Sequence, residues 1–291
     1  MDFLTETFTE VEIYGFELTI DYWVFIFAMA FLGFELLRLT VKKMMSWNLI
    51  GDTVTNFLTL IAFLGVNFTI AGAYVGAFFY VYENWSITQL PINGWLIIGA
   101  VVLADIAYYW EHRFMHRFGL GWATHAVHHS SPYFNISVAY RFGPLDGIFP
   151  IIFHLPLAVI GIHPFVIFLA EAAVQLYQTL LHTEAVGKLP RPIEYFMNTP
   201  SHHRVHHGSN EQYLDKNYAG IFIIWDRIFG TFAEEKEKVS FGVTEPINTI
   251  NPFAVFFCGF AWMWKRFRAA QGVSNKMKAL VLPPDWSPKS N

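Results

Sequence analysis

Residues 53–82 read TVTNFLTLIAFLGVNFTIAGAYVGAFFYVY, thirty consecutive positions without a charged side chain. About 20 apolar residues in a helix cross the hydrocarbon core of a bilayer, so this stretch predicts a membrane-spanning helix. The whole 291-residue chain agrees, because 54% of its residues are hydrophobic, 14% are charged and the mean hydropathy is +0.35. This composition excludes an ordinary soluble globule and predicts an all-α integral membrane protein.

Further apolar stretches lie on both sides of this one. Residues 22–37 and 94–110 each predict one span, and residues 147–170 form another uncharged run. Helix breakers interrupt that last run, so we divide it into two legs, 147–161 and 164–182, which form a helical hairpin that need not cross the membrane fully. The breakers are Pro150, Pro156, Gly161, His163 and Pro164. We therefore expect about four transmembrane helices, of which the last two are the hairpin.

The basic residues favour the hairpin over a single helix, because Lys and Arg prefer cytoplasmic loops. With the N-terminus outside and the run divided, all 19 Lys and Arg lie on one side of the membrane. An undivided helix moves the thirteen from Lys188 onward to the other side. We therefore expect a multi-pass protein of the bacterial inner membrane or the endoplasmic reticulum, with a helical cap on the cytoplasmic face.

All twelve histidines lie between His112 and His207, and three boxes contain most of them. In the first box, HRFMH at 112–116, the i, i+4 spacing puts two imidazoles on one helix face, where both can bind one metal ion. The boxes HAVHH at 125–129 and HRVHH at 203–207 share an H-x-x-H-H pattern. Three boxes within 96 residues predict a metal site on the cytoplasmic side.

The number of histidines indicates two metal ions. The boxes and His182, at the end of the second hairpin leg, supply nine imidazoles, more than one ion can bind. The expected ligands are His112, His116, His125, His128, His129, His182, His203, His206 and His207. His202 is either a ligand or a residue that orients one, whereas His154 and His163 are expected to be structural. Residue type alone leaves Fe, Zn, Cu and Ni open.

Polar residues near the boxes are expected to orient the imidazoles or to take part in catalysis. The main candidates are Asp105, Asn135, Glu184 and Asn217. Further carboxylates flank the boxes: Glu111, Asp215 and Asp226. Glu35 and Glu171 lie within apolar stretches. Burial of an ionisable side chain at membrane depth is energetically unfavourable, so such residues are functional candidates. The alternative for each carboxylate is a solvated charge or a helix cap.

The boxes, in this order and at the ends of membrane helices, resemble those of the fatty acid hydroxylase and sterol desaturase superfamily of integral membrane di-iron oxygenases. The likeness covers residues 105 to about 252, including NTPSHHRVHHG at 198–208 and IWDRIFGT at 224–231. Within the superfamily it is greatest to the members that cleave ether lipids. The resemblance implies two Fe ions, O2 as oxidant, and hydroxylation of a C–H bond in an ether lipid, a sterol or a fatty-acyl chain.

The resemblance also implies an external electron donor, either tetrahydrobiopterin or a separate reductase, because the chain shows no fused haem domain, dinucleotide fingerprint or cysteine cluster. Two other functions are compatible with the sequence. The first is a sterol or fatty-acyl desaturase on the same scaffold. The second is a membrane metal transporter, which requires histidines and acids at mid-membrane with access from both faces.

The chain divides into three expected parts. Residues 1–93 hold the N-terminal membrane helices, 94–250 the catalytic domain, and 251–291 an interfacial helix with a basic tail. For the apolar residues 253–264, packing of the tail on the protein is the alternative. A net charge of −4 gives no reason to expect nucleic acid, and a single cysteine excludes a disulfide framework, a thiolate zinc site and an iron–sulfur cluster.

Overall fold

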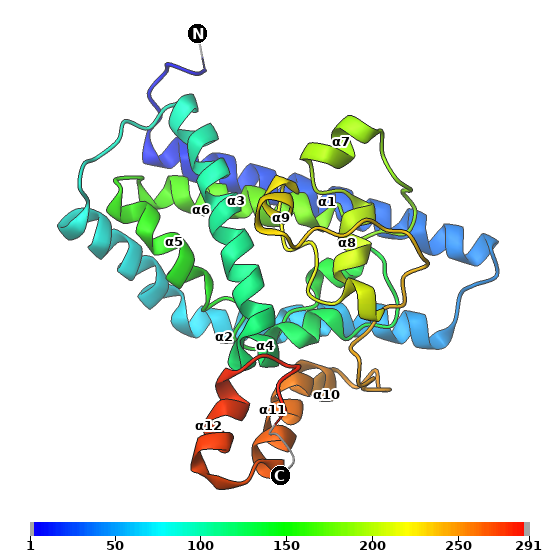
Figure 1. Ribbon diagram of the computed structural model, residues 1–291. Coiled ribbons are helices and arrows are strands. Elements are labelled where there is room, and N and C mark those ends of the chain that lie inside the picture. Colours follow the sequence, from blue (N-terminus) through cyan, green and yellow to red (C-terminus); the bar gives the residue numbers. More distant parts are fainter. Residues whose placement is uncertain (1–2, 288–291) are drawn as a thin grey trace.

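Three long helices carry most of the apolar sequence: α1 (Glu10–Val41), α2 (Trp47–Trp85) and α3 (Gly94–Arg117), as Figure 1 shows. Each begins after a polar residue, Thr9, Ser46 or Asn93, whose side chain accepts a hydrogen bond from a backbone N–H of the first turn. All three are long and apolar enough to cross a membrane. The fold is taken from a computed structural model, which describes residues 3–287.

The first two helices present large apolar side chains outward. Trp23 on α1 is 63% exposed and Phe68 on α2 is 86% exposed. Exposed apolar surface of this size is unfavourable in water and favourable against lipid tails. These helices therefore have the outer surface expected of membrane spans.

The expected break between residues 147 and 182 is confirmed. α5 (Pro150–Val159) and α6 (Pro164–Thr179) are separate helices, and His163 caps the start of α6. Gly161 between them has φ +98°, and its carbonyl accepts a hydrogen bond from the Leu90 N–H at 3.0 Å. α5 and α6 are ten and sixteen residues long, and three helices of the described chain, α1, α2 and α3, are long and apolar enough to span a membrane.

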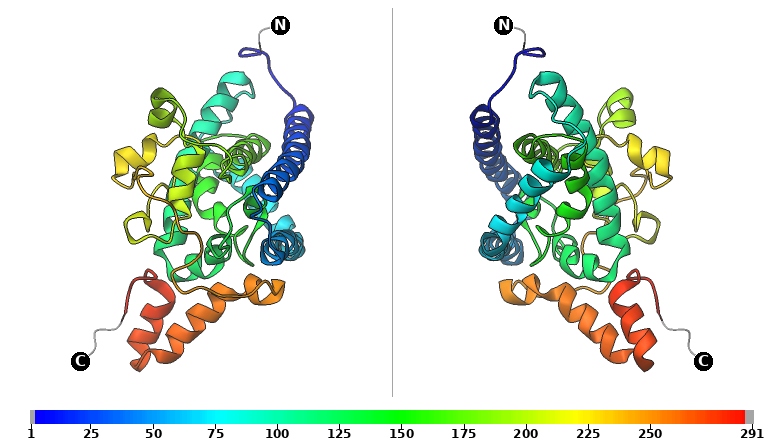
Figure 2. Two further views of the ribbon diagram at one scale, coloured as in Figure 1. Left: turned by 90° about the vertical axis from the view of Figure 1, so that its right-hand side faces the viewer. Right: turned by 90° about the vertical axis from the view of Figure 1, so that its left-hand side faces the viewer.

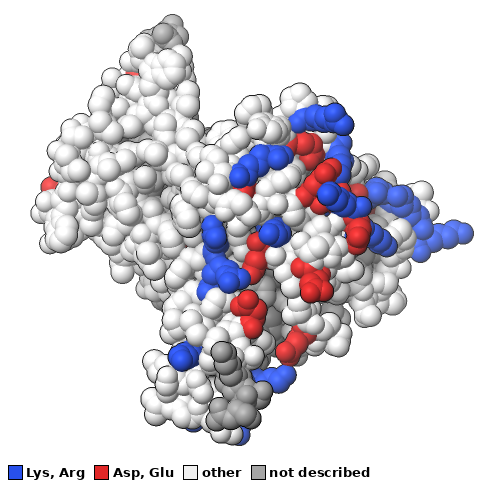
Figure 3. All heavy atoms as spheres, viewed as in Figure 1, with Lys and Arg blue, Asp and Glu red and all other residues white. Residues whose placement is uncertain are grey.

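Short helices form the part of the molecule that carries the second and third histidine boxes. They are α4 (Gly119–His129), η1 (Ile136–Tyr140), α7 (Arg191–Phe196), α8 (Pro200–His206), η2 (Glu211–Tyr213) and α9 (Ile224–Phe229). α3 packs against α4, α5 and α6, and α1 packs against α6. Charged side chains gather over α7–α9, whereas the opposite end of the molecule shows almost none on this face (Figure 3).

The C-terminal segment forms three helices, α10 (Pro252–Phe256), α11 (Cys258–Ala269) and α12 (Gly272–Val281). α10 packs against α2, and α11 and α12 project from the rest of the molecule in Figure 2. α11 and α12 both contact α4. A Cβ at Gly259 would lie 2.1 Å from the Ala123 carbonyl oxygen, so glycine permits the close approach of α11 to α4. The segment expected as one interfacial helix thus contains three helices, two of which contact the domain that carries the boxes.

Candidate metal centre

Nine histidines from four parts of the chain lie together in two groups. The first group contains His112 and His116 from α3, His125 and His129 from α4, and His206 from α8. The second contains His128 from α4, His182 after α6, and His203 and His207 from α8 and its C-cap. In each group, one ring nitrogen from every member lies within 4.8 Å of the others. The two groups consist of the nine histidines expected as ligands.

The H-x-x-H-H pattern explains how one short helix serves both groups. Residues i and i+4 lie on one helix face, while residue i+3 is turned about 60° away from the first. On α4, His125 and His129 belong to the first group and His128 to the second. On α8 the arrangement is reversed, because His203 and His207 belong to the second group and His206 to the first. Each of these helices therefore lies between the two groups.

Backbone carbonyls fix the orientation of four of the imidazoles. The Nδ1 atoms of His112 and His206 lie 2.9 and 3.0 Å from the carbonyl oxygens of Tyr218 and Lys216. The corresponding partners of His128 and His182 are the carbonyls of Arg141 and Gln178, at 3.2 and 2.8 Å. A carbonyl oxygen only accepts, so Nδ1 carries the hydrogen and the Nε2 atom of each neutral ring presents a lone pair.

The Nε2 atoms of neighbouring rings lie at the spacing of ligands around a cation. Nε2 of His128 and Nε2 of His182 are 3.2 Å apart, and neither carries a hydrogen when both rings are neutral. The Nε2 atoms of His112 and His125 are 3.0 Å apart. Two nitrogens bound at right angles to one metal ion, each at about 2.1 Å, are separated by about 3.0 Å. The spacing therefore fits ligands of a shared ion.

Several further ring nitrogens are buried without a hydrogen-bond partner among residues 3–287. Within the two groups they include Nε2 of His116, His129, His206 and His207. Burial of an unsatisfied polar atom is unfavourable, and a metal ion satisfies such an atom. The donor set of both groups thus fits metal ions, and imidazole suits iron among other metals.

Burial also keeps the rings in the form that binds metal. It lowers the pKa of His128 to about 4 and the pKa of His125, His129 and His206 well below the usual value. Neighbouring histidines lower the pKa of the last three further. These imidazoles are neutral at pH 7, and a neutral imidazole coordinates without first losing a proton.

One carboxylate lies directly behind the first group. Asp215 Oδ1 is 3.5 Å from His116 Nδ1, and Arg117 forms an ion pair with the other oxygen. Burial raises the pKa of Asp215, but the contacts with His116 and Arg117 outweigh burial and lower the pKa to about 2. Asp215 is therefore ionised at pH 7 and can hold the Nδ1–H of His116.

Asp105 does not contact a histidine but holds a loop that does. Its carboxylate accepts hydrogen bonds from the backbone N–H groups of Ile221 and Phe222 and from the Trp225 indole. A Cβ at Gly220 would lie 2.5 Å from an Asp105 oxygen, so glycine is needed where the loop closes around the carboxylate. The same loop carries the Tyr218 carbonyl that orients His112.

The other candidates from the sequence lie outside both groups. Asn135 caps η1 by accepting hydrogen bonds from Ser137, and Asn217 bonds the backbone of His202 and Ala233. The exposed Glu184 accepts a hydrogen bond from Arg38 through its backbone carbonyl. His202 Nε2 lies 3.0 Å from Glu194 Oε2, which accounts for its burial without a metal ion.

Sequence reasoning missed a buried ion pair behind the second group. Arg141 is fully buried and donates to Asp52 Oδ1 at 2.9 Å, to Asn56 Oδ1 at 2.7 Å and to the Val127 carbonyl at 3.0 Å. The Arg141 carbonyl in turn binds Nδ1 of His128. The sequence feature that could have indicated this ion pair is Asp52, a charged residue immediately before the uncharged stretch 53–82.

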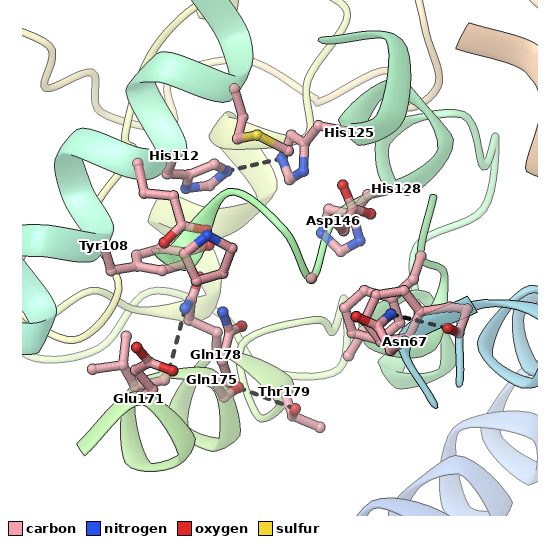
Figure 4. A pocket seen from close by; sticks show the side chains of 18 of the residues that line it. Asn67, Tyr108, His112, His125, His128, Asp146, Glu171, Gln175, Gln178 and Thr179 are labelled. Atoms are coloured by element: carbon pink, nitrogen blue, oxygen red, sulfur yellow. Dashed lines mark hydrogen bonds between the residues drawn. The ribbon is translucent and has the colours of Figure 1, made fainter. Parts of the chain in front are cut away.

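A cavity of about 570 Å³ reaches both groups. His112 and His125 of the first group and His128 and His182 of the second line it. Figure 4 shows His112 and His125 on one side of this pocket and Glu171, Gln175, Gln178 and Thr179 on the other. Its wall along α2 is largely apolar: Leu60, Phe63, Ile70, Ala71 and Val75. An alkyl chain that enters between the helices can therefore reach the histidines.

Residues 97–231 match the sequence model of the fatty acid hydroxylase family. The chain contains a fatty acid hydroxylase domain. The expected superfamily is thereby confirmed, and the matched residues include all nine clustered histidines. With α1, α2 and α3 long and apolar enough to span a bilayer, this domain belongs to an integral membrane protein.

Curated relatives agree with this family. The chain is 44% identical to alkylglycerol monooxygenase of Danio rerio over 215 residues, and 43% identical to that of Homo sapiens over 213. These matches cover 74% and 73% of this chain but only 48% and 47% of the relatives, so the chain spans about half of their length. The ornithine lipid hydroxylase OlsE of Rhizobium tropici is 28% identical over 234 residues, 79% of this chain and 68% of that protein. No solved structure matches the chain.

Proposed function

We propose that the chain is a membrane-bound non-haem di-iron oxygenase that uses O2 to hydroxylate a lipid. The observation that carries this proposal is the convergence of nine histidines, seven buried and two half-buried, into two groups beside a largely apolar cavity. The fatty acid hydroxylase domain supports iron and a lipid substrate. The matches give no support to the desaturase or the metal transporter considered from the sequence.

In this proposal the five histidines of the first group bind one iron ion and the four of the second group bind the other. Iron supplies the activation of O2 that attack on an unreactive C–H bond requires. The residues of the chain hold the ions, orient the imidazoles and exclude water. Asp215 positions His116, and Asp105 positions the loop that contacts His112. Asn135 and Asn217 are positioning residues for the backbone near the boxes, and a role for Glu184 stays a prediction.

The names of the relatives favour an ether lipid as substrate. An alkyl chain from the bilayer enters along the apolar wall of α2, so that the carbon to be oxidised lies beside the histidines. Electrons come from the cytoplasmic side, where we place the boxes, from tetrahydrobiopterin or a separate reductase. The C-terminal helices α11 and α12, with their basic residues, lie near the membrane surface in this arrangement.

Isotope labelling tests the proposal. Purified, iron-loaded protein in lipid nanodiscs is incubated under ¹⁸O2 with 1-O-hexadecylglycerol and tetrahydrobiopterin, and in parallel with a general chemical reductant. We expect lipid-derived product that contains one ¹⁸O atom, and no product from the variant His128→Ala. Absence of labelled product with both reductants, in protein that holds two irons, would contradict the ether-lipid substrate. The same test with a sterol and a fatty acid then identifies the lipid class.

A further inference from the structure

A polar cluster from four helices lies on the cavity wall outside the two histidine groups. It consists of Tyr74 from α2, Glu111 from α3, His154 from α5 and Glu171 from α6. The Tyr74 hydroxyl donates to Glu171 Oε2 at 3.2 Å. Nδ1 of His154 lies 3.5 Å from Glu111 Oε2 and 3.4 Å from Glu171 Oε1. The metal centre described above uses none of these four side chains.

Two carboxylate oxygens of this cluster lack a hydrogen-bond donor among the described residues: Oε2 of Glu111 and Oε1 of Glu171. The side chain of Glu111 is only 7% exposed, so water does not substitute freely. A neutral His154 has one ring hydrogen, and the carbonyls of Pro150 and Ala104, 3.1 Å from Nδ1 and 3.3 Å from Nε2, lie nearer to its nitrogens than either carboxylate oxygen does. Buried acceptors without a donor are unfavourable, and both oxygens belong to side chains that line the cavity.

The other lining residues define the kind of molecule that supplies the missing donors. The wall along α2 fits an alkyl chain, and Glu111 directly precedes His112 in the first group. No Lys or Arg occurs among the described residues that line the cavity, so the part of the wall that carries Glu111 and Glu171 offers no cationic side chain to a phosphate or a carboxylate. A second anion beside two acidic side chains at membrane depth is unfavourable. An ammonium group must lose its hydration to enter, whereas a hydroxyl donates to a carboxylate at a much smaller cost.

We infer that Glu111 and Glu171 form a subsite that binds the uncharged hydroxyl groups of the lipid and rejects anionic head groups. This inference rests on the proposed function, because it takes the cavity as the place of the lipid substrate. It assigns the two glutamates a role in substrate specificity, separate from metal binding. The hydrogen bond from Tyr74 positions Glu171 within the subsite.

Competition binding tests the inference without turnover. Protein in nanodiscs is equilibrated with radiolabelled 1-O-hexadecylglycerol, a diol, under argon so that no turnover occurs. The specifically bound label is then displaced by unlabelled 1-O-hexadecylglycerol, by hexadecanoic acid or by hexadecylamine. All three competitors have the same sixteen-carbon chain and differ in the polar end. We expect the diol to displace the label at concentrations at least tenfold lower than the acid or the amine. Equal displacement by the acid or the amine would overturn the inference.

Variants then assign this selectivity to the glutamates. Glu111→Gln and Glu171→Gln keep the side-chain shape and replace one oxygen by an NH2 group, which cannot accept a hydrogen bond from a hydroxyl. We expect each to weaken binding of the diol about tenfold and to reduce the discrimination against hexadecanoic acid. Glu83→Gln, which changes an exposed acid at the end of α2, is expected to bind as the wild type does. Unchanged binding in both subsite variants would overturn the assignment.

Iron content, measured on the same samples, separates this inference from the proposed function. Wild-type protein with two irons that binds the diol no better than the acid contradicts the subsite alone. Protein that selects the diol but holds no iron contradicts the proposed oxygenase alone. Glu111 adjoins His112, so Glu111→Gln could lose iron as well as lipid selectivity. In that case the binding result for Glu171→Gln tests the subsite, because Glu171 on α6 is far from the histidine boxes in sequence.

Discussion

Asp215 is the carboxylate whose effect on the metal centre is easiest to isolate. Its contact with His116 Nδ1 directs Nε2 of that ring toward the first histidine group. Loss of a carboxylate behind a metal-binding histidine typically costs 10- to 100-fold in metal affinity. We therefore expect Asp215→Asn to weaken binding of the first iron by about tenfold, measured by chelator competition.

Asp285→Asn is the matched control for this prediction. Asp285 also faces Arg117, at 3.9 Å, but it is largely exposed. Iron affinity in this control should equal that of the wild type. If Asp215→Asn also binds iron as the wild type does, Asp215 has no role in orienting His116.

The grouping of the histidines could be predicted at the residue scale because their spacing carries the information. An H-x-x-H-H box on a helix has few purposes other than metal binding, and the structure groups all nine expected residues. The carbonyls of Tyr218, Lys216, Gln178 and Arg141, which orient four of the rings, could not be predicted. Every residue has a carbonyl, so no sequence pattern marks the ones that fold against a histidine.

At the scale of elements, the turn between α5 and α6 depends on Gly161. Its φ of +98° is unfavourable for residues with a Cβ, and a Cβ there would lie 2.2 Å from the Thr88 carbonyl oxygen. We expect Gly161→Ala to destabilise the protein by about 1–3 kcal/mol, measured by thermal unfolding in detergent. Gly99→Ala on α3, where a Cβ has no neighbour within 4 Å, should leave stability unchanged or raise it by about 0.5–1 kcal/mol. Equal effects of the two substitutions would contradict this account of the turn.

The Asp52–Arg141 pair links α2 to the segment that follows α4. Removal of one partner leaves a buried charge unpaired, which typically costs about 3–5 kcal/mol. We expect Asp52→Leu and Arg141→Leu each to be strongly destabilising, and the double variant to be more stable than the sum of the two effects predicts by about 1–3 kcal/mol. The measurement is a double-mutant cycle by denaturant unfolding. Strictly additive effects would show that the two side chains act independently.

The helices themselves were predictable to different degrees. Apolar runs predicted α1, α2 and α3, and prolines with a glycine predicted the break between α5 and α6, since these signals are local. The C-terminal segment was expected as one interfacial helix and instead forms α10, α11 and α12. The approach of Gly259 to Ala123 that brings α11 onto α4 is a tertiary contact, and a single sequence does not encode it in any local pattern.

At the scale of the whole molecule, the placement of all 19 basic residues on one side of the membrane predicts its topology. The test uses a background with Cys258→Ser and single cysteines at Asn84→Cys or Glu237→Cys, both exposed positions. An impermeant maleimide added to intact cells should label position 84 and should reach position 237 only after the membrane is opened. Labelling of both positions from the same side would contradict this topology.

The central claim is that nine histidines hold two iron ions in one chain. The most direct test is the iron content of purified protein, measured by plasma mass spectrometry and divided by the protein concentration from amino-acid analysis. We predict two irons per chain for the wild type and for His202→Ala, whose histidine lies outside both groups, and a loss of iron from His206→Ala and from His203→Ala. A wild-type content of zero or one iron, or an unchanged content in both cluster variants, would contradict the claim.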